Sequence, residues 1–233
     1  MKNKRRKKIL LVLVEGITDQ ASLELILTNL ASNSHKLILQ VTYGDVTSLY
    51  TSTPQNIRSK INELIKSDGK KHLPSDYQEI IHIIDLDGVY LSHDRIIEDL
   101  TLNSLEYHSN EIRAPDINDV IKRNERKKEI INKLITTKFI RRSIPYRLFY
   151  FSCNLEHVLH DVMFVEDKDK IKLANKFEDS YYDNLDKFLD FMCFSDFSSK
   201  QNYLESWDEI KLINAFIPRK TNLDVFLKDY FVE

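Results

Sequence analysis

Residues 9–19, ILLVLVEGITD, decide the fold together with residues 80–88, IIHIIDLDG. Each stretch is a run of apolar, β-forming residues that ends in acidic side chains. These acids are Glu15 and Asp19 in the first stretch, and Asp85 and Asp87 in the second. Apolar runs of this length are typical of buried strands in a mostly parallel sheet. Because ligands of such sheets bind outside the carboxyl ends of the strands, we expect three or four of these carboxylates to share one crevice.

Carboxylates that share a crevice repel one another, and this repulsion raises their pKa values. A divalent cation would relieve the repulsion, and Mg²⁺ and Mn²⁺ both prefer oxygen ligands. We therefore predict a Mg²⁺ or Mn²⁺ site at this edge of the sheet. Glu156 is a further candidate ligand, because it follows an expected strand at residues 147–151 as Glu15 follows the first strand.

The first half of the chain predicts alternating strands and helices. Strands are expected at residues 9–14, 37–41, 77–86 and 147–151. Over residues 19–31 and 57–65, apolar residues recur every three or four positions, as on the buried face of a helix. This β-α-β-α-β order predicts an α/β fold with a mostly parallel central sheet.

The remaining segments divide the chain into two predicted regions. Residues 1–160 are expected to form the α/β domain, interrupted by a helical insertion at about residues 89–144. Residues 161–233 carry Tyr, Phe and Leu at helical spacing and are expected to form an α-helical C-terminal extension. The aromatic residues of this extension are either core residues or a platform on which nucleobases stack.

The insertion contains two helical patterns, at residues 96–105 and 120–135. The second pattern has an apolar face and a strongly charged face. Its basic residues are Lys122, Arg123, Arg126, Lys127 and Lys128. These side chains either contact a substrate or form an ordinary solvated helix face.

The composition is that of an ordinary globular protein: 42% of the 233 residues are hydrophobic and 30% are charged, with a net charge of −2. Two cysteines, Cys153 and Cys193, cannot form a disulfide framework, so a reducing, cytoplasmic location is expected. Residues 2–8 are a basic arm that either contacts nucleic acid or aids solubility. The apolar run after it is too short for a signal peptide or a membrane span, so we expect no targeting and no membrane.

Two short motifs resemble a known domain. A glutamate after the first strand, as in VEGITD, paired with a DxD after a later strand, as in IIDLDG, resembles the TOPRIM domain. That domain occurs in topoisomerases, bacterial primases and several nucleases. The aspartate four residues after the glutamate is similar to the arrangement in OLD-type nucleases and related TOPRIM proteins of bacterial anti-phage systems. The resemblance covers roughly residues 9–160 and implies a Rossmann-like TOPRIM fold.

The resemblance also implies a catalytic site with two Mg²⁺ or Mn²⁺ ions. In that site Glu15 would be a metal ligand or acid/base, Asp85 and Asp87 would be metal ligands, and Asp19 would bind the second metal. Ser152 and Glu156 match only loosely the later polar cluster of this group. Lys220 would be the positively charged catalytic group near the phosphate.

The implied activity is a metal-dependent nuclease that hydrolyses DNA or RNA, as the toxic effector of an anti-phage system. The chain contains no ATPase domain and no GxxxxGK[ST] motif, so a stand-alone nuclease subunit is expected. Its expected partners are the nucleic acid, an ATPase or another defence protein, and further copies of the chain.

The same residues are also compatible with two other functions. DLDGV at residues 85–89 also resembles the nucleophile loop of HAD-type phosphatases, with Asp85 as nucleophile and Asp87 as general acid/base. In those enzymes, however, the motif follows the first strand, and Glu15 and Asp19 would have no role. The third reading is a non-catalytic TOPRIM-like subunit that docks on a partner through its helical C-terminal half.

Overall fold

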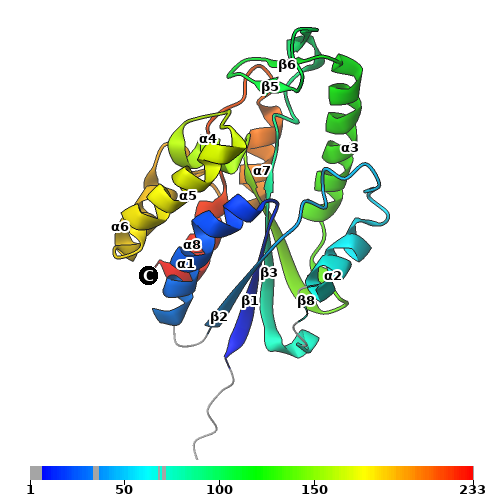
Figure 1. Ribbon diagram of the computed structural model, residues 1–233. Coiled ribbons are helices and arrows are strands. Elements are labelled where there is room, and N and C mark those ends of the chain that lie inside the picture. Colours follow the sequence, from blue (N-terminus) through cyan, green and yellow to red (C-terminus); the bar gives the residue numbers. More distant parts are fainter. Residues whose placement is uncertain (1–6, 34–36, 68, 70–71, 233) are drawn as a thin grey trace, which may run out of the picture.

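The computed structural model describes residues 7–33, 37–67, 69 and 72–232. The protein is an α/β protein built on a five-stranded sheet with the strand order β2-β1-β3-β8-β7 (Figure 1). The strands are β1 (Lys8–Val14), β2 (Leu37–Tyr43), β3 (Tyr77–Asp85), β7 (Phe139–Ile140) and β8 (Ile144–Phe151). Only β7 runs antiparallel to its neighbour, so the prediction of a mostly parallel sheet is confirmed.

Helices cover both faces of this sheet (Figure 1). One face carries α1 (Ile17–Asn33), α4 (Leu155–His160), α5 (Asp167–Tyr181), α6 (Leu185–Phe194) and α8 (Leu223–Phe231). The other face carries α2 (Ile57–Ser67), α3 (Ile117–Ile135) and α7 (Tyr203–Leu212). Side chains of β1 alternate between the two cores: Leu10 and Val12 pack on the first and Leu11 and Leu13 on the second. Burial on both faces explains why β1 is apolar at every position from residue 9 to residue 14 instead of at every second one.

The segment between β3 and β8 differs from the predicted helical insertion. It contains a second, three-stranded sheet formed by β4 (Ile96–Glu98), β5 (Glu106–Tyr107) and β6 (Ile112–Ala114), followed by α3. The prediction of a helix over residues 96–105 is wrong. Ile96 is buried, whereas Ile97 and Leu100 are exposed. The apolar residues of this segment therefore do not form one buried helix face.

The second helical prediction in the insertion is confirmed by α3. The helix begins at Ile117, because the carboxylate of Asp116 accepts hydrogen bonds from the backbone N–H groups of Asn118 and Asp119 and so caps its first turn. Ile130, Ile131 and Leu134 are fully buried against the main sheet. The N-terminal part of α3 lies beside the small sheet, and the rest descends along the main sheet (Figure 1).

The helical C-terminal region is confirmed. Several of its aromatic residues are core residues, whereas Phe164, Tyr182, Phe194 and Phe216 are exposed. Phe177, Phe188 and Phe226 belong to the first core, and Trp207 belongs to the second. The C-terminal helices therefore pack on the same sheet as the preceding residues. The boundary near residue 160 remains a prediction.

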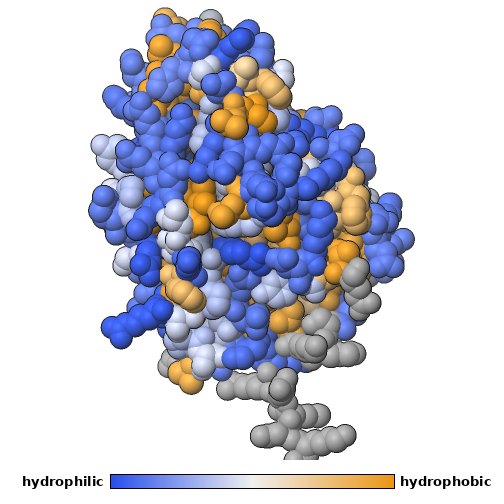
Figure 2. Space-filling view, turned by 180° about the vertical axis from the view of Figure 1, so that it is seen from behind, coloured by the Kyte–Doolittle hydropathy of each residue, from blue (hydrophilic) through white to orange (hydrophobic). Residues whose placement is uncertain are grey.

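The surface opposite the view of Figure 1 is mostly hydrophilic, with hydrophobic patches that are small and separate (Figure 2). Within the described ranges, no helix has the length and apolar character that crossing a bilayer requires. Cys153 and Cys193 are both free and buried. The basic arm lies largely outside the described residues, since only residues 7 and 8 of it are placed.

Candidate functional site

Three neighbouring strands deliver acidic side chains to one edge of the sheet. Glu15 directly follows β1, Asp85 ends β3, and Glu156 lies in the first turn of α4 just after β8. Because β1, β3 and β8 are adjacent and parallel, their carboxyl ends meet at the same edge. The structure thus brings the acids of the two motifs together, as the sequence predicts.

Glu15 lies in a closed environment beside the loop that follows β2. Its Oε1 accepts a hydrogen bond of 2.6 Å from the hydroxyl of Thr47 and lies 3.7 Å from the ammonium of Lys127. Burial raises the pKa of Glu15 to about 8, and the charges of Asp45 and Asp87 add to the rise. Lys127 and the Thr47 hydrogen bond oppose the rise without cancelling it. Glu15 can therefore exchange a proton near neutral pH.

Asp19 is fixed by the turn between β1 and α1. The backbone N–H of Gly16 donates a hydrogen bond of 2.8 Å to its Oδ2, and a Cβ on Gly16 would lie 3.2 Å from that oxygen. The pKa of Asp19 is raised to about 6, chiefly by burial and also by the charge of Glu156. The Gly16 hydrogen bond and the charge of Lys170 act in the opposite direction. Glu156 and Asp19 therefore repel each other.

Asp85 lies among like charges. Burial raises its pKa well above the ordinary value, and the charges of Asp19, Glu15 and Asp87 raise it further. Within the described part of the chain, its carboxylate has no hydrogen-bond or ion-pair partner. Additional positive charge at this position would therefore be strongly stabilising.

The surroundings of Asp87 lower its pKa, in contrast to those of Asp85. Its backbone is in the left-handed region, with φ 53°, which is unfavourable for a non-glycine residue and is often found at functional sites. The hydroxyl of Tyr107 donates to Oδ1 at 3.1 Å, and the ammonium of Lys127 donates to Oδ2 at 2.7 Å. Burial by itself would raise the pKa of Asp87, but the charges of Lys127 and Arg123 outweigh burial and lower it. Asp87 is therefore a fully paired carboxylate.

Lys127 on α3 is the buried cation of the site, with a side chain only 1% exposed. Besides Asp87, its ammonium donates to the hydroxyl of Ser48 at 2.9 Å. Burial would lower the pKa of Lys127, but the charges of Asp87, Glu15 and Asp45 raise it above the ordinary value. Lys127 is consequently charged, and for this residue the expectation of a solvated helix face is wrong.

Arg123 lies one turn earlier on α3 and holds the loop after β3. Its guanidinium donates to the hydroxyl of Tyr107 at 3.0 Å and to the backbone carbonyl of Asp87 at 3.1 Å. Tyr107 comes from β5, so the small sheet and α3 together position Asp87. This is the function of the insertion in the fold: it covers the edge of the sheet where the acids meet.

Asp45, a residue absent from the sequence-based set, also faces the crevice. Its Oδ1 accepts backbone N–H groups of Thr47 at 3.0 Å and Ser48 at 2.8 Å, and so shapes the loop that reaches Glu15 and Lys127. Its charge raises the pKa values of Glu15 and Asp19. The signal was present, because Asp45 follows the end of β2 as the other acids follow their strands.

Lys220 and Ser152 lie in a different contact network. The Lys220 ammonium is 3.0 Å from the carboxylate of Glu209 on α7. The Ser152 hydroxyl donates to the carbonyl of Pro218 and accepts the backbone N–H of Lys220 at 3.0 Å, which holds this loop against the end of β8. The structure thus pairs Lys220 with Glu209 and gives it no contact with the acids; its catalytic role remains a prediction.

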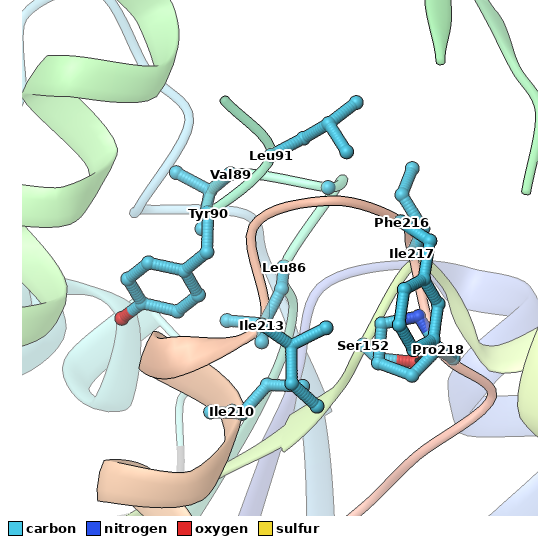
Figure 3. Close-up of a pocket in the computed structure, with 11 residues that line it drawn as sticks. Leu86, Val89, Tyr90, Leu91, Ser152, Ile210, Ile213, Phe216, Ile217 and Pro218 are labelled. Carbon is cyan, nitrogen blue, oxygen red and sulfur yellow. Dashed lines mark hydrogen bonds between the residues drawn. The ribbon is translucent and has the colours of Figure 1, made fainter. Parts of the chain in front are cut away.

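An apolar pocket is lined in part by Leu86 and Gly88, the two sequence neighbours of Asp87 (Figure 3). Leu86 points into it from between the two site aspartates, and Tyr90, Ile213 and Phe216 complete its walls (Figure 3). Such a lining does not suit a phosphate or a metal ion, because it offers few polar partners. None of the acids of the crevice lines this pocket.

The residues at the crevice fit a divalent cation in chemistry but are not arranged at ligand distances. Among the described residues, no three His, Cys, Asp or Glu side chains are positioned to hold a metal ion. The donor atoms are carboxylate oxygens, which select Mg²⁺ or Mn²⁺. The raised pKa values of Glu15, Asp19 and Asp85 show that negative charge is in excess there.

No protein-family model matches this chain, and neither a curated protein nor a solved structure is similar to it. The chemistry of the site is therefore the basis for assigning a function. That chemistry combines excess carboxylates, one acid that exchanges a proton near neutral pH, and buried basic groups on a covering helix.

Proposed function

We propose that the protein is a divalent-metal-dependent nuclease that hydrolyses phosphodiester bonds of DNA or RNA on a TOPRIM-like domain. The observation that carries the proposal is the convergence of Glu15, Asp19 and Asp85 at the ends of two adjacent strands, with raised pKa values. A surplus of buried carboxylates is costly unless a cation is bound. Phosphodiester hydrolysis is a reaction that such carboxylate-bound cations support.

Each group has a proposed role in this reaction. A bound Mg²⁺ or Mn²⁺ ion would supply the Lewis-acid chemistry, activating water and stabilising charge on the phosphate. Asp19, Asp85 and Glu156 are the proposed ligands. Glu15, with a pKa of about 8, holds or releases a proton near neutral pH and acts as acid/base as well as ligand.

The TOPRIM resemblance extends the proposal to a biological setting. The glutamate of VEGITD and the DxD of IIDLDG follow strands that are adjacent in the sheet. On this basis we propose a toxic effector of a bacterial anti-phage system. Its activity would be controlled by an ATPase or another defence protein, or by assembly with further copies of the chain.

Incubation with panels of single- and double-stranded DNA and RNA, including transfer RNA, tests the proposal. Cleavage should require Mg²⁺ or Mn²⁺ and stop on addition of EDTA. Glu15→Gln and Asp85→Asn should each reduce the rate by at least about 100-fold, the magnitude expected for loss of one essential group. Asp94→Asn is the matched control, because Asp94 is an exposed acid. Variants that cleave as well as the wild type would show that the site is assigned incorrectly.

The same variants separate the two alternative functions. A HAD-type phosphatase would release phosphate from small phosphomonoesters, with activity lost in Asp85→Asn and retained in Glu15→Gln. A non-catalytic subunit would cleave no nucleic acid under any metal condition, and Glu15→Gln would leave its biological activity intact.

A further inference from the structure

The edge of the main sheet at β2 is long and uncharged. β2 is an outer strand and, among the described residues, pairs only with β1 (Figure 1). Its sequence over residues 37–43, LILQVTY, carries no charge, although 30% of the chain is charged. Ile38 is 46% exposed and Tyr43 is 47% exposed. An edge strand of this length with exposed apolar side chains is a template for pairing with another strand.

The backbone of β2 offers hydrogen-bonding groups on its outer side. The N–H of Gly44 donates to the carbonyl of Val14 at 2.9 Å, so the even-numbered residues of β2 point towards β1. The residues that point outwards are therefore Leu37, Leu39, Val41 and Tyr43. In the described part of the chain, their outward backbone groups have one hydrogen bond, from the side chain of Gln20 to the carbonyl of Val41 at 3.5 Å. A groove at this edge is lined by Gln20, Val41, Thr42, Tyr43 and Ser67.

The other strands that end a sheet are short. Within the described ranges these are β4, β5 and β7, with two or three residues each. The guanidinium of Arg58 also donates to the carbonyl of Phe139 in β7 at 3.0 Å. Short strands and charged side chains protect a sheet edge from pairing. β2 has neither protection, so association through sheet edges would stop at two chains instead of continuing into a fibre.

We propose that the outer edge of β2 pairs with the same edge of a second copy of the chain, antiparallel and about a two-fold axis at Gln40. In this register Leu39 of one copy lies opposite Val41 of the other, and Ile38 lies opposite Thr42. No like charges meet along the strands, because β2 carries none. Every outward backbone group of β2 gains a partner, which a strand of a different sequence and charge would match less well.

The pairing extends to the candidate site through the loop that follows β2. The paired strand ends at Tyr43, two residues before Asp45. The loop that Asp45 shapes contacts Glu15 and Lys127, so pairing would also hold the start of this loop. The inference does not rest on the proposed nuclease, because the pairing needs neither a metal ion nor a nucleic acid.

A disulfide across the two-fold axis tests the register in the full-length chain. The copies of residue 40 would form a pair without backbone hydrogen bonds, with Cα atoms about 4.5 Å apart, which suits a disulfide. Gln40→Cys should therefore give a cross-linked dimer under mild oxidation, detected by non-reducing electrophoresis. Ile38→Cys is the matched control, because its two copies would lie about 13 Å apart along the strands. Cys153 and Cys193 are buried and are retained in both variants.

The oligomeric state tests the pairing without a new covalent bond. Light scattering after size-exclusion chromatography should give the mass of two chains for the wild type. Ile38→Lys should raise the dissociation constant of the dimer about tenfold, since the two-fold axis introduces the charge twice. Ile97→Lys replaces an isoleucine of β4 that is 41% exposed and should leave the dimer unchanged.

The outcomes separate this inference from the proposed function. A monomeric wild type would overturn the inference and leave the edge to a strand of another protein. Equal cross-linking of Gln40→Cys and Ile38→Cys, or equal dimerisation of Ile38→Lys and Ile97→Lys, would also overturn it. A dimer with the expected cross-link that cleaves no nucleic acid would support the pairing and contradict the nuclease. Circular dichroism of each variant separates loss of the dimer from loss of the fold.

Discussion

The ammonium of Lys127 lies 2.7 Å from the carboxylate of Asp87, and this buried pair joins the covering helix α3 to the end of β3. The two residues are far apart in the sequence and come from different layers of the fold. Their pairing gives the crevice one fixed cation among several acids. It also makes the stability of the protein depend on a group at its candidate site.

Replacement of Lys127 should therefore destabilise the fold strongly. We expect Lys127→Met to lower the free energy of unfolding by about 3–5 kcal/mol, because it leaves Asp87 as a buried charge without its closest partner. Denaturant unfolding measures this. Lys133→Met, at an exposed position of the same helix, should change stability by less than about 0.5 kcal/mol.

A double variant provides the decisive control for this pair. Lys127→Met combined with Asp87→Asn should cost less than the sum of the two single changes, since the second change removes the charge that the first left unpaired. Strictly additive effects would mean that the two side chains do not interact in solution.

In the absence of divalent cations, the free energy of unfolding should fall as the pH rises. Burial raises the pKa of Glu15 from 4.5 to about 8, so the folded state holds this proton more tightly than the unfolded chain does. The resulting stabilisation is complete below pH 4.5 and is lost as the pH rises through about 8. Asp19, with a pKa of about 6, adds to the loss in the lower part of this window.

Thermal unfolding in EDTA between pH 5 and pH 8.5 measures this slope. The change of melting temperature with pH should be smaller in Glu15→Gln than in the wild type. Because both proteins contain His82, its contribution cancels in the difference between them. Burial lowers the pKa of His82 to about 4, so its contribution has the opposite sign below about pH 6.5. Mg²⁺ should raise the melting temperature more at pH 8 than at pH 5. Identical slopes in the two proteins would show that Glu15 does not titrate in this range.

The acids of the crevice could be predicted from the sequence because each follows the end of an apolar strand. Glu15 and Asp85 follow apolar runs, and parallel strands place all such ends at one edge. The same rule would have found Asp45 if it had been applied to β2. The side chain of Lys127 could not be assigned in this way, because a charged helix face has the same pattern whether it meets solvent or an acid on another layer.

The mistaken helix at residues 96–105 has a related cause. Ile96 and Leu100 have helical spacing, but Ile96 packs in the small core beneath the second sheet and Leu100 is exposed. Pairing of β4 with β6 depends on residues that come later in the chain, and short apolar runs do not indicate such partners. Lys220 illustrates the same limit, because its contact with Glu209 is made between distant segments.

Glycine at position 88 should be required for the turn that carries Asp87. Gly88 has φ 63°, and a Cβ there would lie 2.6 Å from the Cδ1 of buried Ile217. We expect Gly88→Ala to cost at least about 2 kcal/mol, from backbone strain together with the steric overlap. Gly69→Ala isolates the strain, because Gly69 has φ 71° but no neighbour within 4 Å, and should cost about 1 kcal/mol. Equal costs in chemical denaturation would mean that the contact with Ile217 relaxes freely.

Tyr50 should contribute to nucleic acid binding if the proposed function is correct. Its side chain is in the loop that shapes the crevice, and the residue is 87% exposed. The guanidinium of Arg126 lies 5.5 Å from the centre of its ring and donates to the backbone carbonyl of Ser48, so the ring and the loop are held together. An exposed ring beside a basic group is suited to stacking with a nucleobase.

We expect Tyr50→Ala to weaken binding of a fluorescent single-stranded oligonucleotide by about 5- to 100-fold, the range for loss of one stacked base. Fluorescence anisotropy with Mg²⁺ in a Glu15→Gln background measures binding without cleavage. Tyr50→Phe should bind like the parent, because stacking needs the ring and not the hydroxyl. Tyr182→Ala removes a ring that is 47% exposed at the end of α5 and should have no effect. If Tyr50→Ala and Tyr182→Ala behave alike, the loop after β2 does not contact the bases, and the nucleic acid must approach the acids from another side.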